Sequence, residues 1–170
     1  MTTPGNSSRT KIKRLPEKAH TDVVALHSVL DSGLVAHVGV VDHGQPIVIP
    51  VGYARDRDTL LIHGSSASRM FTLLDSGSPA CVTVTLLDGL VLARSLFESS
   101  MNYRCAMVFG TATRLSGQAE VDALKVITEH LMPGRWDDAR QPTTKELKAT
   151  MTLSLPIDEY SVKISQGPPD

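Results

Sequence analysis

Aromatic residues and cysteines are scarce in this chain of 170 residues, and neither sign of charge is in excess. Aromatic residues make up 4%, with one tryptophan, and the sequence has two cysteines, 17 basic residues and 18 acidic residues. The balanced charge argues against nucleic acid as a partner, and two cysteines do not make a disulfide framework. The sequence also lacks an apolar leader and a run long enough to cross a bilayer. We therefore expect a cytoplasmic protein that binds neither nucleic acid nor membranes.

Familiar catalytic and metal-binding motifs are also absent. The sequence contains no Gly-x-Ser-x-Gly elbow, no Gly-x-Gly-x-x-Gly loop and no Walker sequence. Its six histidines and two cysteines lack the spacing of metal ligands. We therefore expect no metal site, no Rossmann domain and no nucleoside triphosphatase, and we assign no residue a catalytic role.

The pattern of apolar residues predicts one α+β domain over residues 16–170, after a mobile tail at residues 1–15. The predicted helices are Pro16 to Leu30 with Gly33 as its stop, Ser66–Ser76, Gln118–Met132 and Thr143–Ala149. The predicted strands are Leu34–Val41, Pro46–Tyr53, Thr59–His63, Ala80–Leu87, Leu90–Phe97, Tyr103–Leu115 and Met151–Ile157. Short connections favour antiparallel pairs, and closure would remove the edges of so many apolar strands. We expect an antiparallel barrel of six to eight strands with flanking helices.

Several local features of these strands can be tested against a structure. Pro46 and Pro50 lack the N–H that an inner strand needs, so this part should form an edge or a bulge. Asp88-Gly89 lies between two apolar runs, which is a strong hairpin signal. The two cysteines lie within apolar runs, as His37 does, so we expect two buried free thiols and a core histidine.

The segment Leu60–Met70 is the most informative part of the chain. A short apolar run ends in His63 and Gly64, and three serines and an arginine follow before a helical pattern begins. Backbone N–H groups at a helix N-terminus, together with hydroxyls and a guanidinium, suit a phosphate. Ser68 and Arg69 are the candidate ligands. The structural alternative is a serine N-cap beside a solvent-exposed arginine.

Taken together, several short motifs resemble the flavin-nucleotide-binding proteins of the pyridoxamine 5′-phosphate oxidase-like superfamily, the FMN-binding split barrels. The resemblance covers roughly residues 14–169 and rests on 50–53, 63–70, 81–95, 100–104, 109–110, 133–136 and 161–163. The chain lacks the phosphate signature rich in arginine and lysine, and the C-terminal substrate segment rich in arginine, of the pyridoxamine oxidases themselves. We therefore do not assign pyridoxamine phosphate oxidation.

The resemblance implies a homodimer of split barrels with FMN in clefts between the subunits. The phosphate would lie near Ser68 and Arg69, and the flavin ring along two strands. The implied cofactor-binding residues are Val51, Gly52, Tyr53, His63, Gly64, Ser65, Ser68, Arg69, Thr83, Val84, Thr85, Leu86, Tyr103, Arg104 and Trp136. Each also has a structural interpretation, such as β-propensity for Thr83 and Thr85 or a core or interface plug for Trp136.

The function that the resemblance implies is an FMN-dependent oxidoreductase acting on a small organic molecule, with a nicotinamide cofactor as the candidate electron donor. The flavin would carry the chemistry, which agrees with a sequence that has no evident catalytic group. One alternative is a flavin carrier or redox sensor without turnover. Another is a split barrel that binds haem or the deazaflavin F420, with His63 or His37 as the candidate haem ligand.

Overall fold

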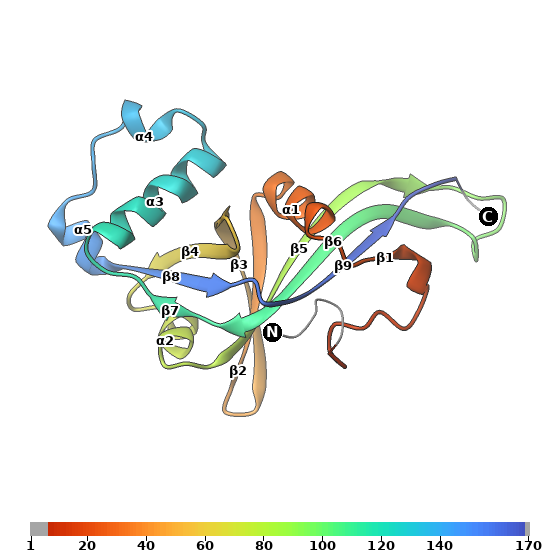
Figure 1. The fold of residues 1–170 in the computed structure, drawn as a ribbon, viewed down its shortest axis with the longest axis horizontal. Coiled ribbons are helices and arrows are strands. Elements are labelled where there is room, and N and C mark those ends of the chain that lie inside the picture. Colours follow the sequence, from red (N-terminus) through yellow and green to blue (C-terminus); the bar gives the residue numbers. More distant parts are fainter. Residues whose placement is uncertain (1–6, 169–170) are drawn as a thin grey trace.

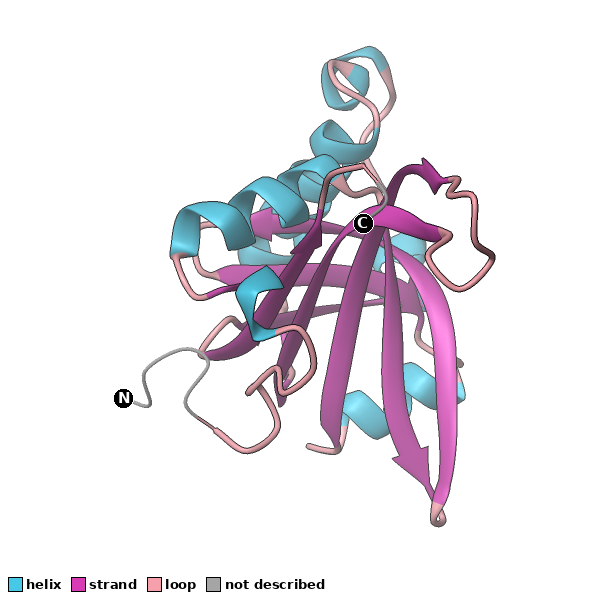
Figure 2. Cartoon of the chain, turned by 90° about the vertical axis from the view of Figure 1, so that its right-hand side faces the viewer, coloured by secondary structure: helices cyan, strands magenta, loops and turns pink. Residues whose placement is uncertain are grey.

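The computed structural model describes residues 7–168, and these fold into one curved antiparallel sheet flanked by helices (Figures 1 and 2). The strand order is β1-β9-β6-β5-β2-β3-β4-β8-β7. The strands are β1 Ala19–His20, β2 Val35–Asp42, β3 Gln45–Asp56, β4 Thr59–Ser65, β5 Pro79–Val91, β6 Ser100–Thr111, β7 Thr113–Arg114, β8 Thr150–Pro156 and β9 Glu159–Ser165. Strand β7 follows directly on β6 yet pairs with β8, so the chain passes there from one part of the sheet to the other, and β6 contacts β8. The predicted antiparallel split barrel with flanking helices is confirmed.

The helices are shorter and more numerous than predicted. They are the 3₁₀ turn Pro16–Lys18, α1 Val23–Ser32, α2 Arg69–Asp75, α3 Gln118–Leu131, α4 Arg135–Asp138 and α5 Thr144–Ala149. The single first helix predicted from Pro16 is wrong, because strand β1 separates the 3₁₀ turn from α1. The side chain of Asp22 accepts a hydrogen bond from the Ala25 N–H (2.8 Å) and starts α1 as its N-cap. Gly33 ends α1, as predicted.

Strand β3 is long because two different neighbours pair with its two parts. Residues 45–52 pair only with β2, and residues 53–56 pair with β4. Pro46 and Pro50 therefore lie where one side of β3 has no neighbouring strand, so no ladder hydrogen bond is lost. The predicted edge position of these prolines is confirmed.

Asp88-Gly89 does not form the predicted hairpin turn, and this prediction is wrong. Strand β5 runs through both residues, and the pairing with β6 shifts between Leu87 and Gly89, which makes a β-bulge. The guanidinium of Arg104 donates to both carboxylate oxygens of Asp88 at 2.8–3.2 Å and holds the bulge residue. The turn instead lies at residues 92–99. The β5–β6 hairpin extends well beyond the barrel (Figure 1), and we call residues 86–103 the arm.

Side-chain alternation along the strands separates a buried interior from an exposed outer face. On β2, Ala36, Val38 and Val40 are buried in the main core, whereas His37 between them is exposed. The prediction of a core histidine is therefore wrong. The two free cysteines, Cys81 and Cys105, are half-buried rather than buried. They lie on the same outer face, where the Thr85 hydroxyl donates to Cys105 Sγ (3.5 Å).

Helix α3 covers part of the outer face and forms a second, smaller core there. Ala54 of β3 and Leu61 of β4 are buried against Ala123 and Ile127 of α3. Gly52 allows this close approach, because a Cβ on it would lie 3.0 Å from the Leu131 side chain. The helix is thus fixed on β3 and β4, and α4 and α5 follow it at the same end of the molecule (Figure 1).

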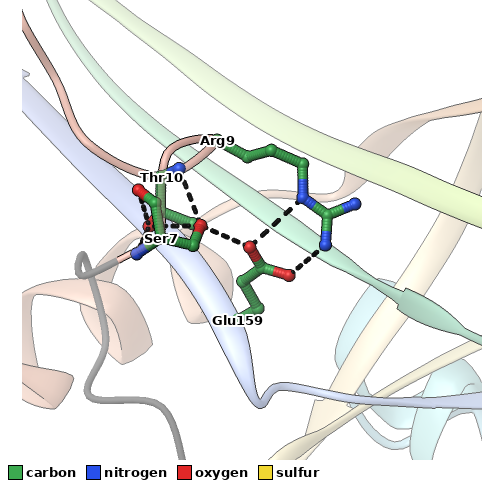
Figure 3. Close-up of polar contacts among 4 residues, drawn as sticks. All are labelled: Ser7, Arg9, Thr10 and Glu159. Carbon is green, nitrogen blue, oxygen red and sulfur yellow. Dashed lines mark hydrogen bonds and ion pairs between the residues drawn. The ribbon is translucent and has the colours of Figure 1, made fainter.

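Part of the predicted mobile tail contacts the sheet in this structure (Figure 3). Residues 1–6 lie outside the described residues, but the hydroxyl of Ser7 and the guanidinium of Arg9 both donate to the Glu159 carboxylate at 2.5 Å. The Arg9 guanidinium also stacks over the Phe109 ring, 5.3 Å from its centroid. Thr10 is buried. Residues 7–10 therefore pack against β9 and β6.

Candidate functional site

A pocket opens over His63 on the outer face of β4, beside α3. It has a volume of about 560 Å³, within the range usual for cofactor sites. His63 follows Leu61 by two residues, so both side chains point to the face that α3 covers. Thr150 of β8 lies in the same wall. The remaining lining residues come from α3, α4, α5 and their connections: Leu124, Thr128, Arg135, Trp136, Asp138, Ala139, Arg140, Gln141, Pro142 and Glu146.

His63 is the only histidine that lines this pocket, and its imidazole is held in the neutral form. Partial desolvation by the surrounding protein lowers the pKa of His63 below its ordinary value. Its side chain nevertheless stays accessible from the pocket. A neutral, accessible imidazole can accept a hydrogen bond or ligate a metal centre through a ring nitrogen.

The charged side chains around the pocket are paired with one another. Arg140 donates to both carboxylate oxygens of Glu146 (2.8 and 2.6 Å), and Arg135 pairs with Asp138 (2.6 Å). Glu146 also accepts hydrogen bonds from the N–H (2.8 Å) and hydroxyl (3.0 Å) of Thr143 at the start of α5. These contacts together hold the pKa of Glu146 well below its usual range. Both guanidiniums can exchange these exposed partners for an anionic ligand at small cost.

Trp136 contributes a flat aromatic side chain to this pocket. His63 and Trp136, 73 positions apart in the sequence, thus line one pocket. The sequence reasoning did not select Arg140, Gln141 or Glu146. The capping-box pattern Thr143-x-x-Glu146 is visible in the sequence, but it indicates a helix start rather than a pocket.

A second group of predicted residues lies on the open outer face of the sheet. Thr83 and Thr85 of β5 and Tyr103 of β6 share this face with the two cysteines, and Thr83 lies opposite His37. All four of these polar side chains are at least partly exposed. This face can receive a flat ligand or a second protein surface.

A third group has its side chains in or against the core. Tyr53 and Val84 are 0% and 1% exposed, and the Tyr53 hydroxyl donates to the Leu30 carbonyl (2.5 Å). Val51 and Leu86 pack against the same core. For Tyr53 and Val84 only backbone groups remain for contact with a ligand, whereas the side chains of Val51 and Leu86 are half-buried.

The predicted phosphate site at Ser68 and Arg69 is partly occupied by the protein itself. The Arg69 guanidinium forms an ion pair with Asp42, a carboxylate that is only 5% exposed. Releasing Arg69 to a phosphate would leave a buried carboxylate without its cation. Ser68 is the N-cap of α2, which has seven residues, and its side chain makes no cap hydrogen bond.

The remaining predicted residues have structural partners. A Cβ on Gly64 would lie 2.4 Å from the Phe71 ring, so glycine here permits α2 to pack on β4. The Ser65 hydroxyl accepts a hydrogen bond from the Ala67 N–H (3.2 Å). Arg104 is bound to Asp88 of the bulge. Over residues 7–168, no group of three or more metal-binding side chains is close enough to hold an ion.

Comparison with known proteins identifies the family. The family described as pyridoxamine 5′-phosphate oxidase matches residues 22–164. The chain belongs to this family. Its members include flavin-binding split barrels, as the motifs implied. No curated protein matches the chain. No helix among residues 7–168 is long and apolar enough to cross a membrane.

Two solved structures support membership of this family, and a third shares the fold. The FAD and haem binding protein from Mycobacterium smegmatis is 43% identical, over 90% of this chain and 76% of that one, with a TM-score of 0.87. The flavocytochrome Anf3 from Azotobacter vinelandii is 39% identical, over 96% and 77%, with a TM-score of 0.89. A FAD-binding protein from Mesorhizobium loti shares the fold, at 15% identity over 86% and 95%, with a TM-score of 0.60.

Proposed function

We propose that the protein is a flavin-dependent oxidoreductase that also binds haem in the His63 pocket. The single observation that carries this proposal is the composition of the pocket. The neutral imidazole of His63, the Trp136 ring and the guanidiniums of two arginines line it together. The similarity to a FAD and haem binding protein and to a flavocytochrome supports it. The substrate remains a small organic molecule, with a nicotinamide cofactor as the reductant.

The residues of the pocket fit a haem group. The neutral imidazole of His63 would ligate the iron, because unprotonated imidazole is the usual axial ligand. Arg135 and Arg140 would bind the propionates after leaving their carboxylate partners. Trp136 and the apolar lining side chains would contact the porphyrin faces and exclude water. When bound, haem supplies one-electron transfer, and flavin supplies both one-electron and hydride transfer.

We propose FAD rather than FMN as the flavin. The protein from Mycobacterium smegmatis that is 43% identical is described as binding FAD, and the cation predicted for the FMN phosphate, Arg69, is paired with Asp42. The outer sheet face with Thr83, Thr85 and Tyr103 would hold the flavin ring. The alternatives are FMN, as predicted from the sequence, and F420. Titration of ligand-free protein with FAD, FMN and F420 in turn would distinguish them.

We propose that the flavin cleft forms between two copies of the chain. Large apolar side chains are exposed along the outer face and the arm, which a monomer rarely tolerates over a continuous patch. They are Val35, Val41, Val48, Leu87, Leu90 and Met101, at 48–73% exposed. A second copy would bury this outer face and cover the flavin.

The cytoplasmic location stays a prediction that cell fractionation would test.

Titration of ligand-free protein with hemin tests the haem proposal. We expect wild-type protein to give a sharp Soret band that saturates at one hemin per chain, and His63→Ala to lose it. His43→Ala is the matched control, because His43 is 94% exposed and lies outside the pocket. If His63→Ala binds hemin to saturation and gives the wild-type spectrum, another group ligates the iron.

Rapid reduction of the flavin-loaded protein separates an oxidoreductase from a carrier or sensor. The loaded protein is reduced with a nicotinamide cofactor and mixed with a panel of small oxidised organic acceptors. We expect at least one acceptor to oxidise the flavin faster than oxygen does. If no acceptor exceeds oxygen, the protein is a flavin carrier or sensor.

A further inference from the structure

The backbone of Trp136 is fixed from two directions by side chains outside its own short helix. The Glu129 carboxylate of α3 accepts hydrogen bonds from the Trp136 N–H and the Gly134 N–H, both at 2.8 Å. The Gln141 side-chain amide donates to the Trp136 carbonyl (3.2 Å). The carboxylate therefore bridges the last turn of α3 to the first turn of α4.

Helix α4 cannot hold this geometry by itself. It has four residues, Arg135–Asp138, and its N-cap is Gly134, which has no side chain to accept the free N–H groups. A helix of one turn has little stability in water, and its first N–H groups need partners from elsewhere. Glu129 supplies those partners. The two backbone bonds lower the pKa of Glu129, so the charged form is present at neutral pH.

Helix α3 gives Glu129 a fixed position from which to act. Ala123 and Ile127 of α3 are 4% and 1% exposed in the core that α3 forms with β3 and β4. Two positions beyond Ile127, the side chain of Glu129 leaves α3 toward α4. A rigid helix, a carboxylate and two short hydrogen bonds thus connect the barrel to the backbone of Trp136.

We propose that Glu129 is a positioning residue that holds the Trp136 ring as a wall of the His63 pocket and so sets the affinity of the pocket for a flat cofactor. This inference rests on the proposed function for the identity of the cofactor. The positioning itself rests on contacts within the chain, from the Glu129 carboxylate to the N–H groups of Gly134 and Trp136.

The first test uses ligand-free protein and its only tryptophan. Acrylamide quenching and near-ultraviolet circular dichroism then report on Trp136 alone. We expect Glu129→Ala to increase quenching and reduce the tryptophan dichroism, and Glu129→Gln to lie between, because its amide oxygen keeps one acceptor. Glu17→Gln is the control, since Glu17 is exposed and distant from this pocket. Wild-type signals in Glu129→Ala would overturn the positioning role.

The second test is a double-mutant cycle with hemin as the probe, followed by the Soret band. We expect Glu129→Ala to weaken hemin binding about tenfold, as the loss of charge-assisted hydrogen bonds would. In a Trp136→Ala background the same change should have no further effect, because Glu129 acts through Trp136. An equal loss in both backgrounds would overturn the proposal. If wild-type protein fails to bind hemin, the haem function is wrong, and the tryptophan signals still decide the role of Glu129.

Discussion

At the scale of single residues, the direction of each side chain on its strand decides what it can contact. His63 and Leu61 point to the outside of β4, so Leu61 packs under α3 and His63 enters the pocket. Tyr53 and Val84 point inward and complete the core. The residue types alone do not distinguish these positions, because an aromatic residue or a valine suits either a core or a cofactor site.

The lowered pKa of His63 predicts a pH-dependent stability. Between that pKa and the ordinary value of 6.5, the folded chain binds fewer protons than the unfolded chain. The free energy of unfolding should therefore fall as the pH drops from 6.5 through the folded pKa. Thermal unfolding of ligand-free protein between about pH 5 and about pH 8 measures this. We expect the free energy of unfolding of His63→Gln to lack the fall that His63 causes below pH 6.5. The same pH profile in His63→Gln and in wild-type protein would contradict the lowered pKa of His63.

Gly64 predicts a steric cost. In Gly64→Ala the new Cβ would meet the Phe71 ring at 2.4 Å, and Phe71 is itself 3% exposed and has little room to move. We expect a loss of about 1–3 kcal/mol in the free energy of unfolding, the usual cost of overpacking. Denaturant unfolding measures it. Gly89→Ala is the control, since a Cβ there meets no atom within 4 Å, and equal effects of the two changes would contradict the packing argument.

At the scale of elements, the pocket depends on three helices that follow one another along the chain. Helix α3 is fixed on β3 and β4, α4 is attached to α3 through Glu129, and α5 begins with a capping box at Thr143. Arg140 and Gln141 lie in the connection between α4 and α5, and α3, α4 and α5 themselves carry Thr128, Arg135, Asp138 and Glu146. The shape of the pocket therefore follows from how the helix ends are fixed.

The capping box predicts a measurable effect of Thr143. Its hydroxyl accepts a hydrogen bond from the Glu146 N–H (3.3 Å), and Thr143→Ala removes this bond. We expect a loss of about 1 kcal/mol, seen as faster hydrogen exchange in residues 144–149 and weaker hemin binding. Thr144→Ala is the control because Thr144 is exposed and outside the cap. Unchanged exchange in Thr143→Ala would contradict the role of the cap.

The position of a helix or strand could be predicted from the sequence where one strong local pattern determines it. The amphipathic pattern of α3 and the alternation in β8 gave their positions within a residue or two. The hairpin turn predicted at Asp88-Gly89 was wrong because the long pairing of β5 with β6 outweighs the local turn preference. The Asp88–Arg104 ion pair stabilises a bulge there instead. Arg140 and Glu146 were not selected because they join His63 only through packing of residues far apart in the sequence.

At the scale of the whole molecule, the barrel leaves one face without a covering element. Helix α3 covers the outer face over β3 and β4, and Arg9 lies over Phe109 on β6. Among residues 7–168, no helix covers the rest of the outer face of β2, β5 and β6, which continues along the arm (Figures 1 and 2). Exposed apolar side chains lie along it. A second copy of the chain is the partner that we propose for this face.

The open face predicts a dimer that a single charge can split. Light scattering should give twice the 18.3 kDa of one chain for wild-type protein. Val48→Asp adds a charge at a residue that is 62% exposed on this face, so we expect the monomer mass. Val24→Asp on α1 is the control, at 73% exposed. A wild-type monomer, or a dimer insensitive to Val48→Asp, would contradict the proposed interface.

The measurement that most directly tests the central claim is the absorption spectrum of freshly purified protein, with mass spectrometry of the ligands released on denaturation. We expect flavin bands together with a Soret band, and release of FAD and haem. A flavin spectrum without a Soret band, in protein that also fails to take up hemin, would contradict the haem site at His63. Protein that neither contains nor binds a flavin would contradict the proposed oxidoreductase function.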